Sequence, residues 1–445
     1  MKPQKLYMCI VLLLIGLGLA LNLRINHHEP NHSKPNIILF TFDALRADHL
    51  GIYGYDKNTS PNIDDLAKNS YVFTNSFSQC GSTACSLPSL HTSLFPLEPK
   101  SNATTIARFL KSQGYNTIGV IAVRFANSTY VNKDGFDIYD ENFTFWENSS
   151  VTVNRALSIL DQAKQPFFLW VHVRQPHGPY NPRKEIFLEM YPHNDEPTFY
   201  SDIPNLDWSG LQEYLLEYYT NKGEIEEKYA TMRRFPGLIT PTMLAQIIAM
   251  YDGNIKEADI SFGGFLKYLK SKRLLDNTII IVSADHGESL GEHNIIDHNN
   301  LYYVTLHTPL IVHFPSNEHK VIGYPVMNVD IFPTIISLLN ISTNFTLKGK
   351  NLFDSNRTDY FQYAEYSNER WTIKYGAYKL IHKNNESMLF NVEEDPAEQH
   401  NLLVLNPKQY SNLTNMFIGL HDNLSRDRET TNFNILAKLR ALGYI

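Results

Sequence analysis

The sequence predicts an α/β fold in which helices flank a large, mostly parallel sheet, with a small antiparallel sheet and a helix at the C-terminal end. Hydrophobic residues make up 43% of the 445 residues, which is ample for a large buried core. Short runs rich in Ile, Val and Phe alternate with segments whose apolar residues recur every three or four positions, a pattern typical of layered α/β domains. Near the C-terminus, shorter alternating runs separated by Gly and Asn take over.

The apolar runs are predicted to be buried parallel strands, because strands covered by helices on both faces are almost continuously hydrophobic. In chain order these runs are 36–42, 116–123, 166–173, 277–284 and 308–314. The helical spacing between them predicts helices over 104–114, 151–164 and 240–276. The C-terminal part is predicted to hold short antiparallel strands over 360–392 and a closing helix over 406–424.

The chain is expected to divide into three parts. These are an N-terminal signal or membrane anchor with its linker (1–33), a large α/β domain (34–345) and a smaller C-terminal subdomain (346–445). Residues 183–240 lack clean periodicity and are rich in acidic residues, Tyr and Pro. We expect them to form an insertion that shapes a substrate rim.

The N-terminal sequence predicts an export signal, because two lysines precede an uncharged apolar run from Leu6 to Leu21. The run is shorter than the roughly 20 residues that span a membrane, and no clear cleavage site follows, so a retained anchor and a cleaved signal both stay open. Either way, the rest of the chain is expected to lie outside the cytoplasm. N-x-S/T sequons such as Asn127, Asn340 and Asn412 recur more often than the Asn content alone gives, which favours a glycoprotein.

The charge argues against a nucleic-acid-binding protein, and the cysteine content argues against a domain held together by several disulfides. The formal net charge is −7, from 39 basic and 46 acidic residues, and no Lys/Arg-rich run occurs, so nucleic acid is not the expected partner. With three cysteines, one of them (Cys9) in the signal, the chain has no disulfide framework. Cys80 and Cys85 can pair to close a short loop, and two reduced, buried thiols fit the sequence equally well.

Acidic residues and a histidine follow two of the predicted strands. Asp43 ends the first strand in FTFDALRADH, and Asp285 and His286 end another in IIIVSADHGE. A single buried acid at a strand end is usually a cap or a salt-bridge partner. Two carboxylates and an imidazole at the same sheet edge are typical of a divalent cation site, because desolvated oxygens need a counter-charge.

Ser86 is the candidate nucleophile, in the stretch TACSLPSLHTS. Pro88 suits the first turn of a helix and so predicts that Ser86 lies at or just before the helix N-terminus. There the free amides and the helix dipole favour an anion, although a serine at this position is ordinarily only an N-cap. Beside a metal ion, its hydroxyl would ionise and attack the phosphorus or sulfur of an ester.

Histidines are expected to supply proton transfer and positive charge. His177, in WVHVRQPHGPY, lies in a loop past a strand, while His172 within that strand is interpreted as a core residue. His298 lies twelve residues after His286, beyond a Gly-containing loop that would fold it back over the metal ion. The alternative for His298 is an ordinary surface histidine.

These residues resemble the sulfatase branch of the alkaline phosphatase superfamily. The resemblance runs in order from 34 to 405 and rests on NIILFTFDALRADHLGIYGY, SLPS, HVRQPHGPY, YDGNIKEAD, SADHGESLGEH, TPLIV and VDIFPTIISLL. It implies an alkaline phosphatase-like fold, with the catalytic domain over 34–345. It also implies a metal-dependent hydrolase of sulfate or phosphate esters, acting on an anionic glycan, lipid or small molecule.

The resemblance also assigns roles to the candidate site residues. The metal ligands would be Asp43, Asp285 and His286, joined by Ser86 in the nucleophile position. The ion would be Mn, Zn, Mg or Ca, with the histidine favouring the first three over Ca, and a second metal ion stays open. The remaining roles, binding the anionic group or protonating the leaving oxygen, fall to His177 and His298.

Two departures from the sulfatase pattern bear on the reaction. Leu90 stands where the formylglycine motif has an arginine, and Cys85 is one residue out of register with that motif. The Lys-x-His motif that follows the next strand in arylsulfatases is absent from IAVRFANSTY. An unmodified Ser86 would favour phosphorus, because a phosphoserine is hydrolysed by in-line attack of water whereas a sulfated serine lacks the exit that a formylglycine hydrate has.

Two classes of function follow. The first is the sulfate or phosphate ester hydrolase, with an unmodified-serine phosphodiesterase or a phosphoryl-group transferase as its variants. The second is a catalytically silent, glycosylated surface protein that keeps the fold for binding, to which Leu90 and the missing Lys-x-His motif point. The presence of all the candidate metal and histidine residues favours the enzyme.

Overall fold

The structure is a computed structural model that describes residues 34–100, 103–144, 147–191, 241–357, 360–384 and 386–428. The described residues from Asn36 onward group into one compact unit. The predicted signal or anchor (1–33) and most of the predicted insertion (183–240) lie outside the described residues, which include only the insertion's first helix, α6 (Lys184–Met190). Among the described residues, no helix combines the length and the apolarity needed to cross a membrane.

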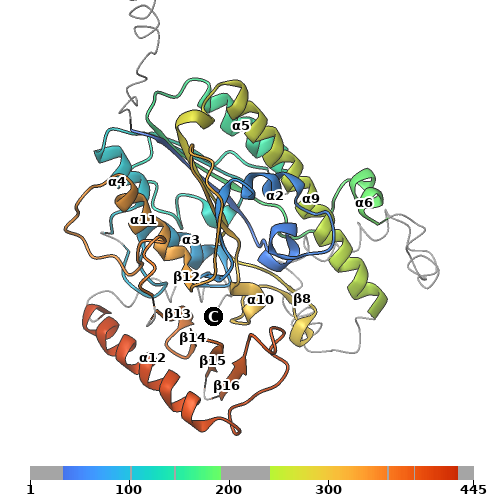
Figure 1. The fold of residues 1–445 in the computed structure, drawn as a ribbon, viewed down its shortest axis with the longest axis vertical. Coiled ribbons are helices and arrows are strands. Elements are labelled where there is room, and N and C mark those ends of the chain that lie inside the picture. The colour runs from blue at the N-terminus through green and yellow to red at the C-terminus, as the bar shows by residue number, and fades with distance from the viewer. Residues whose placement is uncertain are drawn as a thin grey trace, which may run out of the picture. The chain divides into compact units, whose positions relative to one another are not determined.

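The centre of the fold is an eight-stranded sheet with strand order β11-β2-β10-β7-β1-β6-β4-β5. Helices surround this sheet (Figure 1). Its strands are β1 (Asn36–Phe42), β2 (Ser70–Phe73), β4 (Asn116–Ile121), β5 (Ile138–Asp140), β6 (Phe167–Val173), β7 (Thr278–Ala284), β10 (Leu310–His313) and β11 (Lys320–Ile322). β1 pairs in parallel with both β6 and β7, so these three strands end at the same edge. The predicted strands over 36–42, 166–173 and 277–284 are therefore confirmed.

The sequence predicts a parallel strand over 308–314, and this predicted direction is wrong. β10 is buried as expected, but it runs antiparallel to both β7 and β2. A parallel return from β7 needs a crossover along a face of the sheet, usually a long helix. The chain between β7 and β10 contains the short helix α10 (Tyr303–Leu306), a 3-10 turn (Glu292–Asn294) and a two-stranded ribbon, β8 (Ser289–Leu290) with β9 (Ile296–Asp297), but no long helix. It therefore comes back in the opposite direction.

Helices cover both faces of the sheet, because β1 is apolar on both sides. Ile38, Phe40 and Phe42 pack into one core with helices α2 (Pro61–Ala67), α5 (Ser149–Leu160) and α9 (Pro241–Ser271). Ile37 and Leu39 pack into a second core with α3 (Thr83–Thr92), α4 (Ile106–Ser112) and α11 (Ile331–Leu338). The helices predicted over 104–114, 151–164 and 240–276 are thus confirmed.

The C-terminal part forms the small antiparallel sheet that the sequence predicts. Its strands follow one another in space as in sequence: β13 (Gln362–Ser367), β14 (Arg370–Tyr375), β15 (Tyr378–Lys383) and β16 (Glu386–Asn391). Helix α12 (Pro407–Arg428) contacts β14 and β15. A two-stranded ribbon of β3 (Ser76–Phe77) and β12 (Val326–Met327) completes the strands. The domain boundary at 345/346 stays a prediction.

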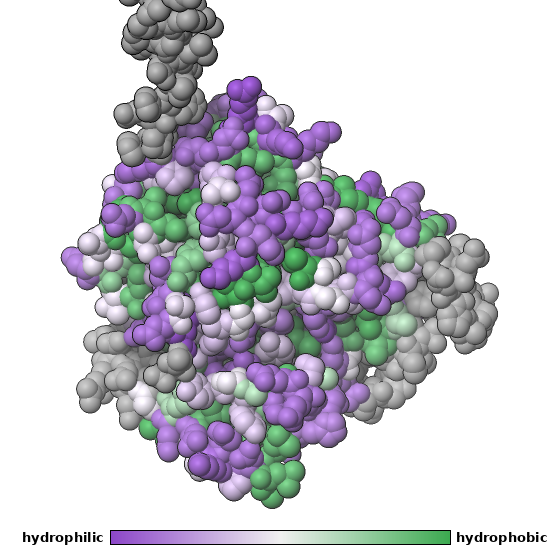
Figure 2. All heavy atoms as spheres, viewed as in Figure 1, coloured by the Kyte–Doolittle hydropathy of each residue, from purple (hydrophilic) through white to green (hydrophobic). Residues whose placement is uncertain are grey.

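The surface is mixed in character. On the face seen in Figure 2, hydrophilic side chains cover much of the described surface and smaller apolar areas lie between them. The candidate metal ligands Asp43, Asp285 and His286 are instead buried, at the edge where β1, β6 and β7 end.

Candidate active site

Two acidic residues meet at the sheet edge because their strands are neighbours. Asp43 directly follows β1, and its N–H donates to the Val173 carbonyl at the end of β6 (3.0 Å). Asp285 directly follows β7, and its N–H donates to the Phe42 carbonyl (3.3 Å). The backbone pairing of the sheet therefore continues through both acids and fixes their positions.

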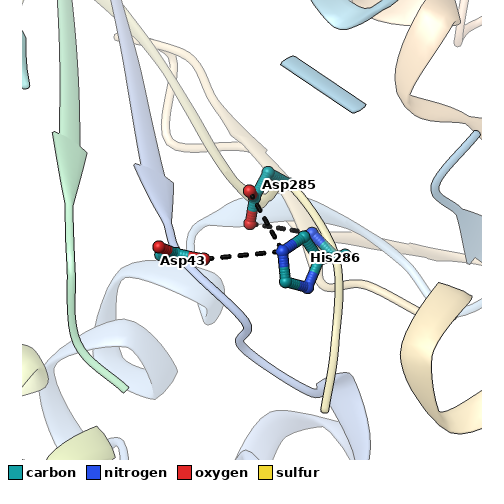
Figure 3. Close-up of side chains that lie close together, drawn as sticks. All are labelled: Asp43, Asp285 and His286. Carbon is teal, nitrogen blue, oxygen red and sulfur yellow. Dashed lines mark hydrogen bonds and ion pairs between the residues drawn. The ribbon is translucent and has the colours of Figure 1, made fainter. Parts of the chain in front are cut away.

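The side chains of Asp43, Asp285 and His286 converge as the sequence predicts (Figure 3). The His286 Nε2 atom lies 3.5 Å from Asp43 Oδ1 and 3.5 Å from Asp285 Oδ2. The ligand atoms of the three residues lie within 4.8 Å of one another, and all three residues are buried. We refer to these three residues as the acidic triad.

The triad presents atoms that accept rather than donate. The His286 Nδ1 atom lies 2.8 Å from the Gly287 carbonyl, which can only accept, so Nδ1 carries the proton and Nε2 a lone pair. Burial lowers the pKa of His286, which keeps the ring neutral. Asp285 Oδ1 accepts from the N–H groups of Ala44 and His286, whereas its buried Oδ2 makes no hydrogen bond within the described part of the chain.

Such an arrangement is unfavourable without a cation. Burial raises the pKa of the Asp43 carboxyl well above its usual range, and the neighbouring carboxylates of Asp285 and Glu288 raise it further. A divalent ion between the two carboxylates and His286 Nε2 would reverse this effect by supplying positive charge where only acceptors meet. Oxygen and imidazole donors suit Mn, Zn or Mg, and Ca less well.

The two predicted histidines lie beside the triad. The His298 ring centroid is 4.6 Å from that of His286 and 4.9 Å from that of His177. The loop after His286 therefore folds back over the site, and the surface alternative for His298 is wrong. His298 Nδ1 lies 3.1 Å from Glu288 Oε1 and 3.1 Å from Asp297 Oδ1, and these three residues form a second possible set of metal ligands.

A backbone hydrogen bond holds His177 next to Asp43. The His177 N–H donates to the Asp43 carbonyl (3.1 Å), and Nδ1 lies 2.7 Å from the Gly178 carbonyl. Arg174, which is also buried, donates from Nη1 to the His177 carbonyl (2.7 Å). The Arg174 charge lowers the pKa of Asp43, although it does not outweigh burial. Sequence reasoning missed Arg174, despite its place between the two histidines of WVHVRQPHGPY.

The structure corrects the expected place of Ser86. α3 begins at Thr83, with Ser82 as its N-cap, because the Ser82 carbonyl accepts from the N–H groups of Cys85 (3.2 Å) and Ser86 (3.0 Å). Ser86 thus lies a turn inside the helix and not at its N-terminus, and Pro88 lies within the helix instead of starting it. The Ser86 hydroxyl is buried and makes no hydrogen bond to the described residues.

A different hydroxyl reaches the acidic triad. Thr83 Oγ1 lies 3.3 Å from Asp43 Oδ1 and 3.2 Å from His286 Nε2. Thr83 is the first residue of α3 and is buried. Sequence reasoning missed it, although it lies three residues before Ser86 and therefore on the same face of the helix.

Neighbouring residues have structural roles. Cys80 and Cys85 form a disulfide, which decides between the two states that the sequence left open. Arg46, which belongs to the first motif, pairs with Asp48 and Glu292, both at 2.7 Å. The prediction that His172 is a core residue is confirmed, since it is fully buried and its Nδ1 lies 2.9 Å from Thr41 Oγ1.

Comparison with protein families gives two matches. The profile described as Sulfatase matches residues 35–341, and the profile described as N-sulphoglucosamine sulphohydrolase, C-terminal, matches residues 291–429. Among individual proteins, the arylsulfatase of Clostridium perfringens is 26% identical over 85% of this chain and 91% of its own length. The iduronate 2-sulfatase of Homo sapiens is 26% identical over 67% of this chain and 62% of its own.

Solved structures share the fold. A protein crystallised with its substrate D-glucosamine-2-N,6-O-disulfate superposes with a TM-score of 0.70 at 18% identity, over 89% of this chain and 100% of that one. The phosphonate monoester hydrolase of Agrobacterium radiobacter superposes with a TM-score of 0.67 at 16% identity, over 89% of this chain and 96% of that one. The fold is therefore shared by a protein with a disulfated substrate and by one named as a phosphonate monoester hydrolase.

Proposed function

The chain belongs to the sulfatase family, and from that premise we propose that it is a metal-dependent hydrolase of anionic sulfate or phosphate esters that acts outside the cytoplasm. Family membership makes it an ester hydrolase of the sulfuric ester hydrolase class or a related phosphoesterase. The metal dependence, the location and the choice of ester are parts of the proposal.

One observation carries the metal dependence. In the acidic triad, two carboxylates and a neutral imidazole nitrogen meet in a buried place where only acceptor atoms face one another. Buried charges of this kind are stable only when they are paired or bind a metal ion. Asp43, Asp285 and His286 would hold the ion, which supplies charge that polarises the ester and favours ionisation of a nearby hydroxyl.

The remaining residues would bind the substrate and move protons. His298 lies next to both His286 and His177, and the two histidines His177 and His298 would bind the anionic group or donate a proton to the leaving oxygen. Because Nδ1 of His177 contacts the Gly178 carbonyl and Nδ1 of His298 contacts two carboxylates, the Nε2 atoms would perform these steps. A hydroxyl at the start of α3 would attack the ester, helped by the helix dipole.

The substrate class is an anionic ester, for which the named relatives provide the parallel. One solved neighbour holds a disulfated glucosamine, and another is named for phosphonate monoesters. We propose a sulfated or phosphorylated glycan, lipid or small molecule as the substrate. An N-terminal anchor, where it is retained, would hold the enzyme at a membrane.

Metal analysis combined with ester hydrolysis tests the proposal. The full chain is loaded with Mn, Zn, Mg or Ca, its metal content is measured, and hydrolysis of nitrophenyl sulfate, nitrophenyl phosphate and bis-nitrophenyl phosphate is compared. We expect about one ion per chain and turnover of at least one ester, both lost in Asp285→Asn. A folded wild-type chain that binds no divalent ion and cleaves none of the esters would instead be the silent binding protein.

A further inference from the structure

We propose that Thr83, and not Ser86, supplies the hydroxyl that binds the metal ion and attacks the ester, and that the ester is therefore a phosphate. The inference rests on the proposed function, because it assigns the nucleophile and the ester class of the same site. It replaces the sequence-based assignment of Ser86.

The position of the Thr83 hydroxyl is the first argument. Thr83 Oγ1 lies 3.3 Å from Asp43 Oδ1 and 3.2 Å from His286 Nε2, which are two of the three converging ligand atoms. The hydroxyl has one proton and faces two acceptors, so it can satisfy only one of them. Thr83 would therefore join Asp43, Asp285 and His286 in holding the ion, and its hydroxyl would supply the attacking oxygen.

Ser86 lacks a comparable connection. It lies one helical turn further along α3, where its N–H already donates to the Ser82 carbonyl (3.0 Å). Its hydroxyl makes no hydrogen bond to any described residue, and so none to Asp43 or His286. Two hydroxyls therefore lie on one face of α3, and the one nearer to the N-terminus reaches the acidic triad.

The local fold holds Thr83 where an anion is stabilised. Thr83 is the first residue of a ten-residue helix, and the Ser82 side chain does not cap the free amides of its first turn. The dipole and these amides favour the ionised oxygen of a nucleophile and the charge of a bound phosphoryl group. The Cys80–Cys85 disulfide closes a loop that contains Thr83 and so restricts the start of the helix.

The chemistry of threonine decides the ester class. Formylglycine is an aldehyde made by oxidising a side chain whose β-carbon carries two hydrogens, and the β-carbon of threonine carries a methyl group instead. Thr83 can therefore act only as an alcohol. A sulfated alcohol has no aldehyde to form as it expels sulfate, whereas a phosphorylated alcohol is released by in-line attack of water on phosphorus.

The two steps balance in atoms and protons. In the first, Thr83 Oγ1 bonds to phosphorus, the bond from phosphorus to the leaving oxygen breaks, and the hydroxyl proton is released to water. The leaving oxygen takes a proton from His177 or His298. In the second step, water attacks phosphorus and passes a proton to Thr83 Oγ1 as the bond from phosphorus to this oxygen breaks. The products are phosphate, or a phosphomonoester from a diester, and a regenerated threonine alcohol, and the histidine regains from solvent the proton that it gave to the leaving oxygen.

The test compares four variants of the full chain. Thr83→Val removes the hydroxyl and keeps the shape, Thr83→Ser restores a hydroxyl, and Ser86→Ala removes the competing one. Ser89→Ala is the matched control, since Ser89 is a buried hydroxyl of the same helix that donates to the Cys85 carbonyl (3.0 Å). Manganese affinity is measured by calorimetry, and the covalent adduct is trapped with nitrophenyl phosphate, quenched in acid and located by peptide mass spectrometry.

We expect the phosphoryl group on residue 83 in the wild type and in Ser86→Ala and Ser89→Ala, and on the new serine in Thr83→Ser. In Thr83→Val the adduct is absent and the manganese affinity falls by about 10- to 100-fold. A phosphoryl group on Ser86, formylglycine at position 86, or wild-type manganese affinity and turnover in Thr83→Val would overturn the inference. Turnover with no adduct on 83–89, unaffected by Thr83→Val, would overturn it as well.

The failure of the proposed function gives a different result. In that case the wild-type chain binds no manganese and cleaves neither sulfate nor phosphate esters. When the wild type binds manganese and cleaves an ester, the proposed function stands, and the position of the adduct together with the results for Thr83→Val decides between Thr83 and Ser86.

Discussion

Buried acidic residues occur in two contrasting surroundings in this molecule. The acidic triad is one, and the cluster around Asp330, just before α11, is the other. Asp330 is fully buried, yet it receives a bond from Arg357 Nη1 (2.8 Å) and from the N–H groups of Met327 and Lys350 (both 2.8 Å), together with the Tyr360 hydroxyl. Every acceptor position of Asp330 thus has a donor from the protein itself.

The triad is equally buried but receives fewer donors from the protein, and no positively charged side chain pairs directly with its carboxylates among the described residues. Its atoms meet as acceptors, and Asp285 Oδ2 makes no hydrogen bond within the described residues. The contrast teaches that burial of an acid does not by itself indicate function. A buried acid whose charge is balanced within the chain stabilises the fold, and one whose charge is left unbalanced is suited to bind a cation.

The largest effect is expected from Asp285→Asn, which removes a charge from the unbalanced site. Ester turnover falls by about 10³-fold or more, because the ion contributes several kcal/mol to the transition state. The metal-free protein keeps its stability or gains about 1 kcal/mol, since the amide can donate to its acceptor neighbours. Urea unfolding in EDTA measures this, and a loss of stability as large as that expected for a balanced pair would break the comparison.

Arg357→Met removes the partner from the balanced cluster. We expect the free energy of unfolding to fall by about 3–5 kcal/mol, because Asp330 is left as an unpaired buried charge. Manganese affinity at the triad should be unchanged in the folded protein. Arg108→Met is the matched control: Arg108 pairs with Asp134 on the surface, and its loss should cost less than about 1 kcal/mol. Equal effects of the two substitutions would contradict the assignment.

Metal binding at the triad should stabilise the protein. At a free manganese concentration about 100 times Kd, the free energy of unfolding rises by about 2.7 kcal/mol, and EDTA reverses the gain. Thermal unfolding with and without the ion measures the shift. Asp285→Asn should abolish it, whereas Arg357→Met should retain it in full despite its lower starting stability.

The smallest effect is expected from Lys374, a buried lysine of β14 whose charge is only weakly balanced by neighbouring groups. Burial lowers its pKa to about 8. Between pH 8 and the usual lysine value of about 10.4, the unfolded chain binds more protons than the folded one, so stability rises with pH by on the order of 1–2 kcal/mol. Lys374→Met should flatten this rise in urea unfolding measured from pH 7.5 to 10, and an unchanged slope would show that Lys374 is not desolvated.

The sequence was sufficient for those parts of the site that depend on strand ends. Asp43, Asp285 and His286 follow continuous apolar runs, and neighbouring parallel strands bring such residues together. The spacing of His298 from His286 across a Gly-containing loop likewise predicted its return to the site. These inferences needed only the positions of the strand ends, which the hydrophobic pattern indicates.

Other features depend on local geometry that the pattern does not contain. The start of α3 is set by the Ser82 carbonyl, and a shift of one turn decides whether Ser86 or Thr83 faces the triad. The position of Pro88, a residue common in the first turn of a helix, favoured a later start of this helix. The apolar residues of β10 fit a parallel and an antiparallel strand equally well. The direction of β10 is therefore set by how the short connection from β7 turns.

The disulfide between Cys80 and Cys85 bears on the timing of activation. A reducing cytoplasm keeps such cysteines as thiols, so a newly made chain would lack the covalent closure around Thr83 until it reached an oxidising compartment. The abundant phosphate esters of the cytoplasm would then meet a loosely formed nucleophile. On the proposed location outside the cytoplasm, export would complete the closure around Thr83 after the chain has left the cell's own metabolites.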